Sequence, residues 1–140
     1  MLGEEKRIRE DYVETGQLTY IFWPVLNHGN NSIFAHAAMD CVAHQDAKLG
    51  WDMHEVLFIN QRSLWSASRD FFVEQASFVG ADIPLFEQCF DSGEGVERVQ
   101  ALDAIRRDRG VRSQPVFDVN GDVVKGFGST LNTLLDRHLP

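Results

Sequence analysis

Apolar residues recur at intervals of three and four through most of the chain, a spacing that predicts a protein built mainly from helices. The longer helices are predicted over residues 32–47, 51–60, 68–79, 83–90, 96–109 and 129–138. A shorter helical stretch over residues 4–15 ends at Gly16, a typical C-terminal stop. Since no repeat or linker interrupts this pattern, we expect one domain spanning residues 1–140.

Three further stretches have the character of strands. Residues 18–23 are rich in aromatic and β-branched side chains and are closed by a proline, which predicts a buried strand. Residues 116–119 and 122–124 flank Asn120-Gly121, a strong hairpin signal, and predict an antiparallel pair. Pro115 belongs at the first position of this hairpin, because it has no N–H group to give to a ladder.

Composition excludes several classes of function. A chain of 140 residues that is 44% hydrophobic is long enough to bury a core. Its net charge of −8 argues against a nucleic-acid partner. We also expect no membrane span, because no apolar run approaches the length of a bilayer. The first residues are too polar for a signal peptide, so the compartment stays open: cytoplasmic as written, extracytoplasmic if an upstream segment belongs to the protein.

The order of these elements resembles the DsbA-like family of the thioredoxin fold. Residues 110–117, Gly-Val-Arg-Ser-Gln-Pro-Val-Phe, with the following Val-Asn-Gly, resemble the cis-proline loop and terminal hairpin of that family. Residues 37–45, Ala-Ala-Met-Asp-Cys-Val-Ala-His-Gln, and 50–58, Gly-Trp-Asp-Met-His-Glu-Val-Leu-Phe, resemble its helical insertion. The resemblance implies an α/β, thioredoxin-like fold with a helical insertion over about residues 30–92.

The same resemblance implies a binding loop. In this family the bond before the loop proline is cis, and the backbone ahead of it pairs with an extended substrate. By resemblance, the substrate-binding residues are Arg112, Ser113, Gln114 and Pro115. Such loops keep backbone groups available for strand addition. The implied partner is an extended peptide or a protein thiol or disulfide.

The chain departs from the family pattern at its beginning. The family opens with a further strand and a Cys-x-x-C motif at the start of a helix, whereas Met1 stands part-way through that helix. The missing strand would lie between residues 18–23 and the hairpin, so we expect an N-terminally truncated sheet. Its two neighbours then pair directly, or a second copy supplies a strand across a homodimer interface, or the chain is a fragment of a longer protein.

The two cysteines, Cys41 and Cys89, are too far apart in sequence to form a Cys-x-x-C pair. They stand at positions where some family members carry a second, structural disulfide. The alternative is two buried thiols that pack as small apolar groups. We expect neither form to be catalytic.

One group of residues has the spacing of a metal site. His36, Asp40 and His44 follow each other at intervals of four and share one helical stripe. Because no glutamate base or third histidine stands with them, we interpret the stripe as a solvated helix face. We expect no metal and no cofactor.

These observations predict a DsbA-family thiol-disulfide oxidoreductase-like protein without the redox cysteine pair. The family mechanism needs a thiolate of low pKa at a helix N-terminus, so redox catalysis by this chain alone is expected to be absent. Two alternatives stay open. One is a non-catalytic module that binds a peptide or a partner. The other is a glutathione-dependent isomerase or transferase of the kappa type, which shares the fold without Cys-x-x-C.

Overall fold

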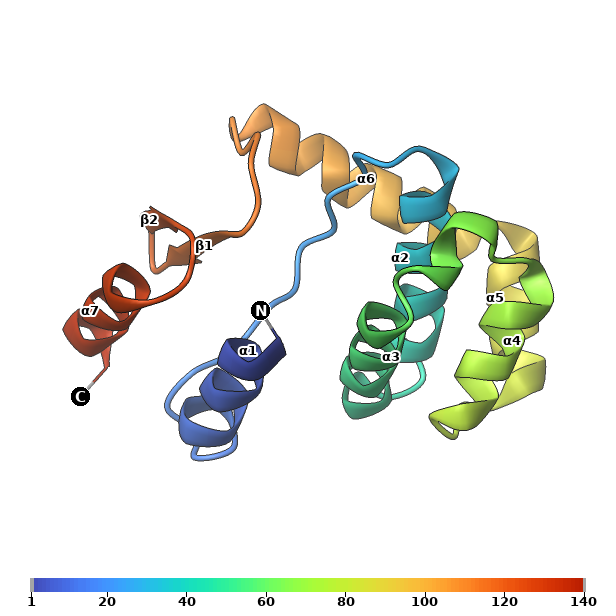
Figure 1. Cartoon of the computed structure of the whole chain (residues 1–140), viewed down its shortest axis with the longest axis horizontal. Helices are drawn as coiled ribbons and strands as arrows, with labels where there is room; N and C mark the ends of the chain where they lie inside the picture. Colours follow the sequence, from blue (N-terminus) through green and yellow to red (C-terminus); the bar gives the residue numbers. More distant parts are fainter. Residues whose placement is uncertain (1, 140) are drawn as a thin grey trace. The chain divides into compact units, whose positions relative to one another are not determined.

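Helices account for most of the chain, as the spacing of apolar residues predicts (Figure 1). The computed structural model describes residues 2–139. Its elements are α1 (Leu2–Ile8), the π-helix η1 (Arg9–Val13), α2 (Asn30–Ala43), α3 (Ala47–Ile59), the 3-10 helix η2 (Ser63–Ser66), α4 (Arg69–Phe78), α5 (Ile83–Ser92), α6 (Glu94–Asp108), β1 (Val116–Val119), β2 (Asp122–Lys125) and α7 (Ser129–His138). Within the described residues, no helix combines the length and the apolar character that crossing a bilayer requires.

The chain divides into two units, each with its own core. The helical unit is Pro24–Arg106, and the hairpin unit combines Met1–Trp23 with Arg107–Pro140. The insertion predicted over about residues 30–92 lies within the helical unit. Helix α6 begins in the helical unit and ends just beyond its boundary.

The helical unit is held together by closely packed helices (Figure 1). Phe86 and Met53 are its largest fully buried side chains, and Phe86 stacks on Phe90 at a ring distance of 5.3 Å. Helices α2 and α3 approach each other at Gly50, where an added Cβ would lie 2.5 Å from Cβ of Ala43. Asp46 begins α3 by accepting hydrogen bonds from the first-turn N–H groups, so α3 starts earlier than its apolar pattern predicts.

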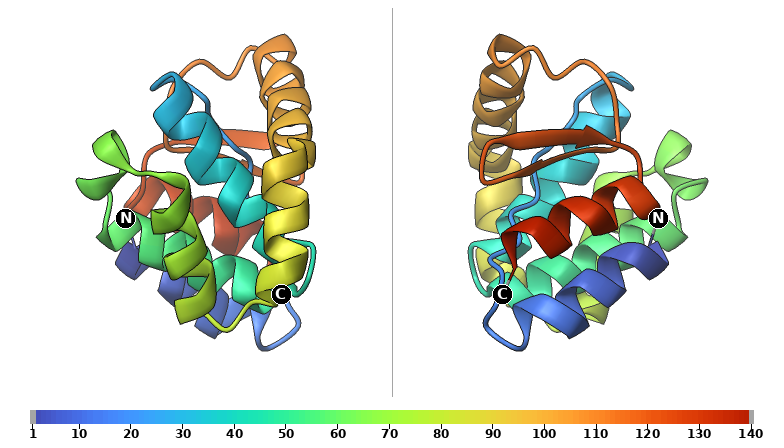
Figure 2. Two further views of the ribbon diagram at one scale, coloured as in Figure 1. Left: turned by 90° about the vertical axis from the view of Figure 1, so that its right-hand side faces the viewer. Right: turned by 90° about the vertical axis from the view of Figure 1, so that its left-hand side faces the viewer.

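The hairpin unit is built on two strands and α7, which lies along them (Figure 2). Strands β1 and β2 pair antiparallel, with Val119 opposite Asp122. The turn between them places Asn120 and Gly121 at φ values of 52° and 99°, the conformation that the Asn-Gly signal predicts. Leucines of α7 cover the hairpin and pack against Ile8 of α1.

The strand predicted over residues 18–23 is wrong. Leu18 and Tyr20 pack against the core of the hairpin unit, whereas Ile21, the next residue along the chain, is 70% exposed. The segment therefore has the alternating burial that is typical of a strand. Among the residues that the structure describes, however, this segment belongs to no ladder, and the sheet consists of β1 and β2. A strand needs a hydrogen-bonded neighbour as well as a suitable pattern. Direct pairing of residues 18–23 with the hairpin, one of the three expected arrangements, is therefore not found.

Candidate substrate-binding loop and cysteine pair

The loop between α6 and β1 contains the residues predicted to bind substrate. Gly110 ends the preceding helix, and its N–H donates to the carbonyl of Arg107 over 2.9 Å. Arg112, Ser113 and Gln114 then follow in the loop, and all three are exposed. Pro115 is partly buried, and the Gln114–Pro115 peptide bond is cis.

The backbone of this loop has open hydrogen-bonding positions. Within residues 2–139, no acceptor is found for the N–H groups of Arg112, Ser113 or Gln114. Since all three residues are exposed, water can satisfy these N–H groups. The loop can therefore donate hydrogen bonds to an incoming chain.

The outer edge of β1 continues this open surface. Gly126 donates to the carbonyl of Pro115 over 3.0 Å, which fixes which pairs of the ladder are hydrogen-bonded. Bonded and non-bonded pairs alternate along an antiparallel ladder, so the N–H and C=O groups of Val116 and Asp118 point away from β2. In the described part of the chain no strand occupies that side. The further strand that the family pattern places beside the hairpin would need such an open edge.

Two contacts hold the surroundings of the loop in place. The guanidinium of Arg109 lies 5.7 Å from the centre of the Trp23 ring, a cation–π contact between the end of α6 and the segment 18–23. Burial, followed by the charge and the hydrogen bond of Glu5, raises the pKa of Tyr20 in the same segment. Tyr20 is therefore a neutral hydrogen-bond donor inside the hairpin unit.

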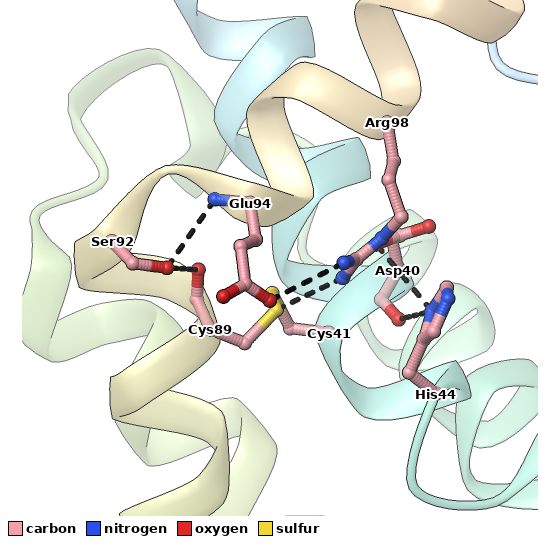
Figure 3. A network of polar contacts seen from close by, with 7 residues as sticks. All are labelled: Asp40, Cys41, His44, Cys89, Ser92, Glu94 and Arg98. Atoms are coloured by element: carbon pink, nitrogen blue, oxygen red, sulfur yellow. Dashed lines mark hydrogen bonds and ion pairs between the residues drawn. A yellow bond between two sulfur atoms is a disulfide. The ribbon is translucent and has the colours of Figure 1, made fainter.

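In the helical unit, Cys41 of α2 and Cys89 of α5 form a disulfide, with their Cα atoms 5.8 Å apart. Cys41 is buried and Cys89 is partly exposed. Arg98 of α6 reaches this pair: its Nη2 donates to Cys89 Sγ over 3.1 Å, and its Nε donates to Asp40 over 2.7 Å (Figure 3). Sequence reasoning missed Arg98, because its spacing from either cysteine carries no signal.

The structure gives each member of the His36, Asp40, His44 stripe a partner within the helical unit. Nδ1 of His36 is hydrogen-bonded to the carbonyl of Ser32 over 2.7 Å, and burial lowers the pKa of this imidazole. His44 bonds the carbonyl of Asp40, and the carboxylate of Asp40 pairs with Arg98. The interpretation of this stripe as a solvated helix face is therefore wrong for Asp40, whose side chain is 14% exposed and holds Arg98, and right for His44, which is exposed.

The comparisons with known proteins agree with this architecture. The family model described as Thioredoxin matches residues 3–136. The chain belongs to the DsbA-like thioredoxin-fold family. It is also similar to the crystal structure of the thiol-disulfide exchange protein alpha-DsbA2 from Wolbachia pipientis, with a TM-score of 0.73 and 20% sequence identity. That match covers 96% of this chain and 73% of the other chain. A search of the curated proteins found no match.

Membership confirms the predicted fold class, a thioredoxin-like fold with a helical insertion. In this DsbA-like chain the two candidate sites lie in different units. The hairpin unit carries the loop of residues 112–115 and the open edge of β1, whereas the helical unit carries both cysteines. The 140 residues contain no Cys-x-x-C motif.

Proposed function

We propose that this DsbA-like chain binds an extended segment of a protein thiol or disulfide substrate along the loop of residues 112–115. The observation that carries the proposal is a run of open backbone groups. Within residues 2–139, no acceptor is found for the N–H groups of Arg112, Ser113 or Gln114.

An extended peptide fits this surface for a general reason. It presents N–H and C=O groups at every second residue on one edge, and its C=O groups can accept hydrogen bonds from the open N–H groups of residues 112–114. Affinity then comes from main-chain hydrogen bonds, and exposed side chains such as Arg112 and Gln114 select among peptides.

The test uses a fluorescent ten-residue peptide of extended character in which serine replaces cysteine. Two further versions carry N-methyl groups, one at the odd and one at the even positions. Since strand addition uses the N–H groups of one parity only, we expect one N-methylated version to lose binding and the other to keep it. Backbone amide shifts in the protein should change at residues 112–118.

Side-chain variants sharpen the test. Arg112→Ala and Gln114→Ala should weaken binding about two- to tenfold each, the range of a single lost hydrogen bond. Arg62→Ala and Gln61→Ala are the matched controls, because both residues are exposed and lie in the helical unit. Equal binding of both N-methylated peptides, or shifts confined to residues outside the hairpin unit, would contradict the proposal.

A further inference from the structure

Arg98 makes a direct contact with one sulfur of the disulfide. Its Nη2 donates to Cys89 Sγ over 3.1 Å, while Asp40 and Glu94 hold the other nitrogens of the guanidinium at 2.7 Å and 3.5 Å (Figure 3). A disulfide sulfur is a weak acceptor, whereas a thiolate is an anion that accepts a charge-assisted bond. Arg98 therefore stabilises Cys89 more in the reduced state than in the oxidised state.

The second sulfur lies against the beginning of α6. A Cβ added to Gly95, the second residue of that helix, would be 2.7 Å from Cys41 Sγ. In the described residues, the N–H groups of Gly95 and Val96 have no acceptor. First-turn N–H groups and the helix dipole together stabilise a negative charge at this place. A thiolate on Cys41 would thus have its own stabilising group.

Accessibility distinguishes the two sulfurs. Cys41 is 2% exposed and lies under α6, whereas Cys89 is partly exposed. In place of the non-catalytic bridge expected from the sequence, we propose that the Cys41–Cys89 disulfide is a redox site that exchanges with the thiols of a dithiol partner, and that Cys89 is the sulfur attacked. This site is separate from the peptide surface of the hairpin unit, so the proposal does not rest on the function proposed above.

The exchange balances in two steps. A thiolate of the partner attacks Cys89 Sγ, forming a mixed disulfide, and Cys41 leaves as a thiolate at the start of α6. The second thiolate of the partner then attacks its own sulfur in the mixed disulfide, and Cys89 leaves as a thiolate beside Arg98. The partner gains a disulfide and loses two electrons, and the cysteine pair gains those electrons. Oxidised glutathione restores the bond by a separate exchange: the Cys89 thiolate attacks it and releases one glutathione thiolate, and the Cys41 thiolate then attacks Cys89 Sγ and releases the second.

Two carboxylates oppose this stabilisation. Asp40 lies within 4.8 Å of both sulfurs, and Glu94 also faces Arg98. Because both carboxylates form ion pairs with the guanidinium, their negative charges interact mainly with Arg98. His44 adds a further contact to Asp40, with Nδ1 3.6 Å from the carboxylate. Replacing Arg98 alone measures how much this guanidinium stabilises the Cys89 thiolate in the presence of the two carboxylates.

The experiment incubates the oxidised full chain with reduced glutathione in the presence of EDTA, which suppresses metal-catalysed oxidation of thiols. Acid quenching and peptide mapping locate the adduct. We expect glutathione on Cys89 and none on Cys41. In the reduced chain, the pH midpoint for alkylation of Cys89 should lie below about 8.5, the ordinary cysteine pKa.

Variants of Arg98 separate a chemical role from a structural one. Arg98→Ala should raise that alkylation midpoint by about one pH unit or more, and Arg98→Lys should restore most of the shift. Arg98→Gln, which keeps donors without the charge, should behave like Arg98→Ala. The matched control, Arg62→Ala, should leave the midpoint unchanged.

Several results would overturn the proposal. One is a disulfide that glutathione reduces no faster than the chain unfolds globally. Others are an adduct on Cys41 or an unchanged alkylation midpoint in Arg98→Ala, with folding checked by circular dichroism. Reduction of a disulfide-containing protein that persists after Cys41 and Cys89 are both replaced by alanine would place the exchange elsewhere.

Discussion

At the scale of single residues, the protonation of Tyr20 makes the stability of the fold depend on pH. Its pKa is raised by burial first and by Glu5 second, so the neutral phenol is the form that fits the hairpin unit. Glu5 itself is buried, with 7% of its surface exposed. A group whose pKa is higher in the folded state contributes stability below its unfolded pKa and loses it as the pH rises further.

We therefore expect the free energy of unfolding to fall above about pH 10, the ordinary pKa of tyrosine. Tyr20→Phe should remove this part of the high-pH loss. Urea unfolding measured from pH 8 to pH 11.5 gives the comparison. Tyr12→Phe is the control, since it leaves Tyr20 in place and should keep the loss. Parallel curves for the wild type and Tyr20→Phe above pH 10 would show that Tyr20 is already solvated.

At the scale of elements, two glycines set the distances between helices. Gly50 brings α3 against Ala43 of α2, and Gly95 brings α6 against Cys41 and the carbonyl of Ala37. An added Cβ would lie 2.5 Å from Cβ of Ala43 in the first case and 2.9 Å from the Ala37 oxygen in the second. Neither neighbour is the end of a flexible side chain, so the helices themselves would have to separate.

We expect Gly50→Ala and Gly95→Ala to destabilise the chain by about 1–3 kcal/mol each, the usual cost of overpacking. The sign is the informative part, because alanine is ordinarily favoured over glycine inside a helix by about 1 kcal/mol. Gly3→Ala is the matched control: Gly3 lies in α1 with nothing within 4 Å of an added Cβ, and this variant should be neutral or stabilising. Thermal unfolding of the three variants measures the difference. Stabilisation by Gly50→Ala or Gly95→Ala would mean that these helices are not in close contact.

The elements also show how far the sequence alone can predict this fold. Helices with a local signal were predicted well: Asp82 caps α5 through the N–H of Leu85, as its place before Ile83-Pro84 indicates. The hairpin was predicted because Asn120-Gly121 is itself the turn. Residues 18–23 have the composition of a strand but no ladder in the described chain, and no local pattern reports on a missing partner.

The candidate sites follow the same rule. Residues 112–115 were predicted from a contiguous motif, and Arg112, Ser113 and Gln114 among them are exposed, whereas their role in binding stays a prediction. The buried ion pair of Asp103 and Arg106, at 2.7 Å, and the contact of Arg98 with Cys89 were not predicted. Both depend on which face of α6 meets another element, and the mixed charges of α6 leave that face undefined in the sequence.

At the scale of the whole molecule, the open question is whether the two units unfold together. The chain passes between them twice, at residues 23–24 and 106–107, and the second crossing lies inside α6. Helix formation is cooperative, so a helix that crosses the boundary between two units favours their unfolding together. We therefore predict that residues 1–140 unfold as one cooperative domain.

The test destabilises one unit and observes the other. Replacing Cys41 and Cys89 by alanine removes the disulfide of the helical unit, which joins two residues that are 48 positions apart in the sequence. The chain-entropy relation puts the loss of unfolding free energy at about 4 kcal/mol, an upper figure.

With Trp51 and Trp65 changed to phenylalanine, fluorescence of Trp23 reports on the hairpin unit, whereas far-ultraviolet circular dichroism reports mainly on the helices. In a cooperative domain both signals have one urea midpoint, and the double alanine variant lowers that midpoint equally for both. If the Trp23 midpoint stayed fixed while the helical signal moved, the units would be independent domains, because a disulfide can stabilise only the structure that unfolds with it.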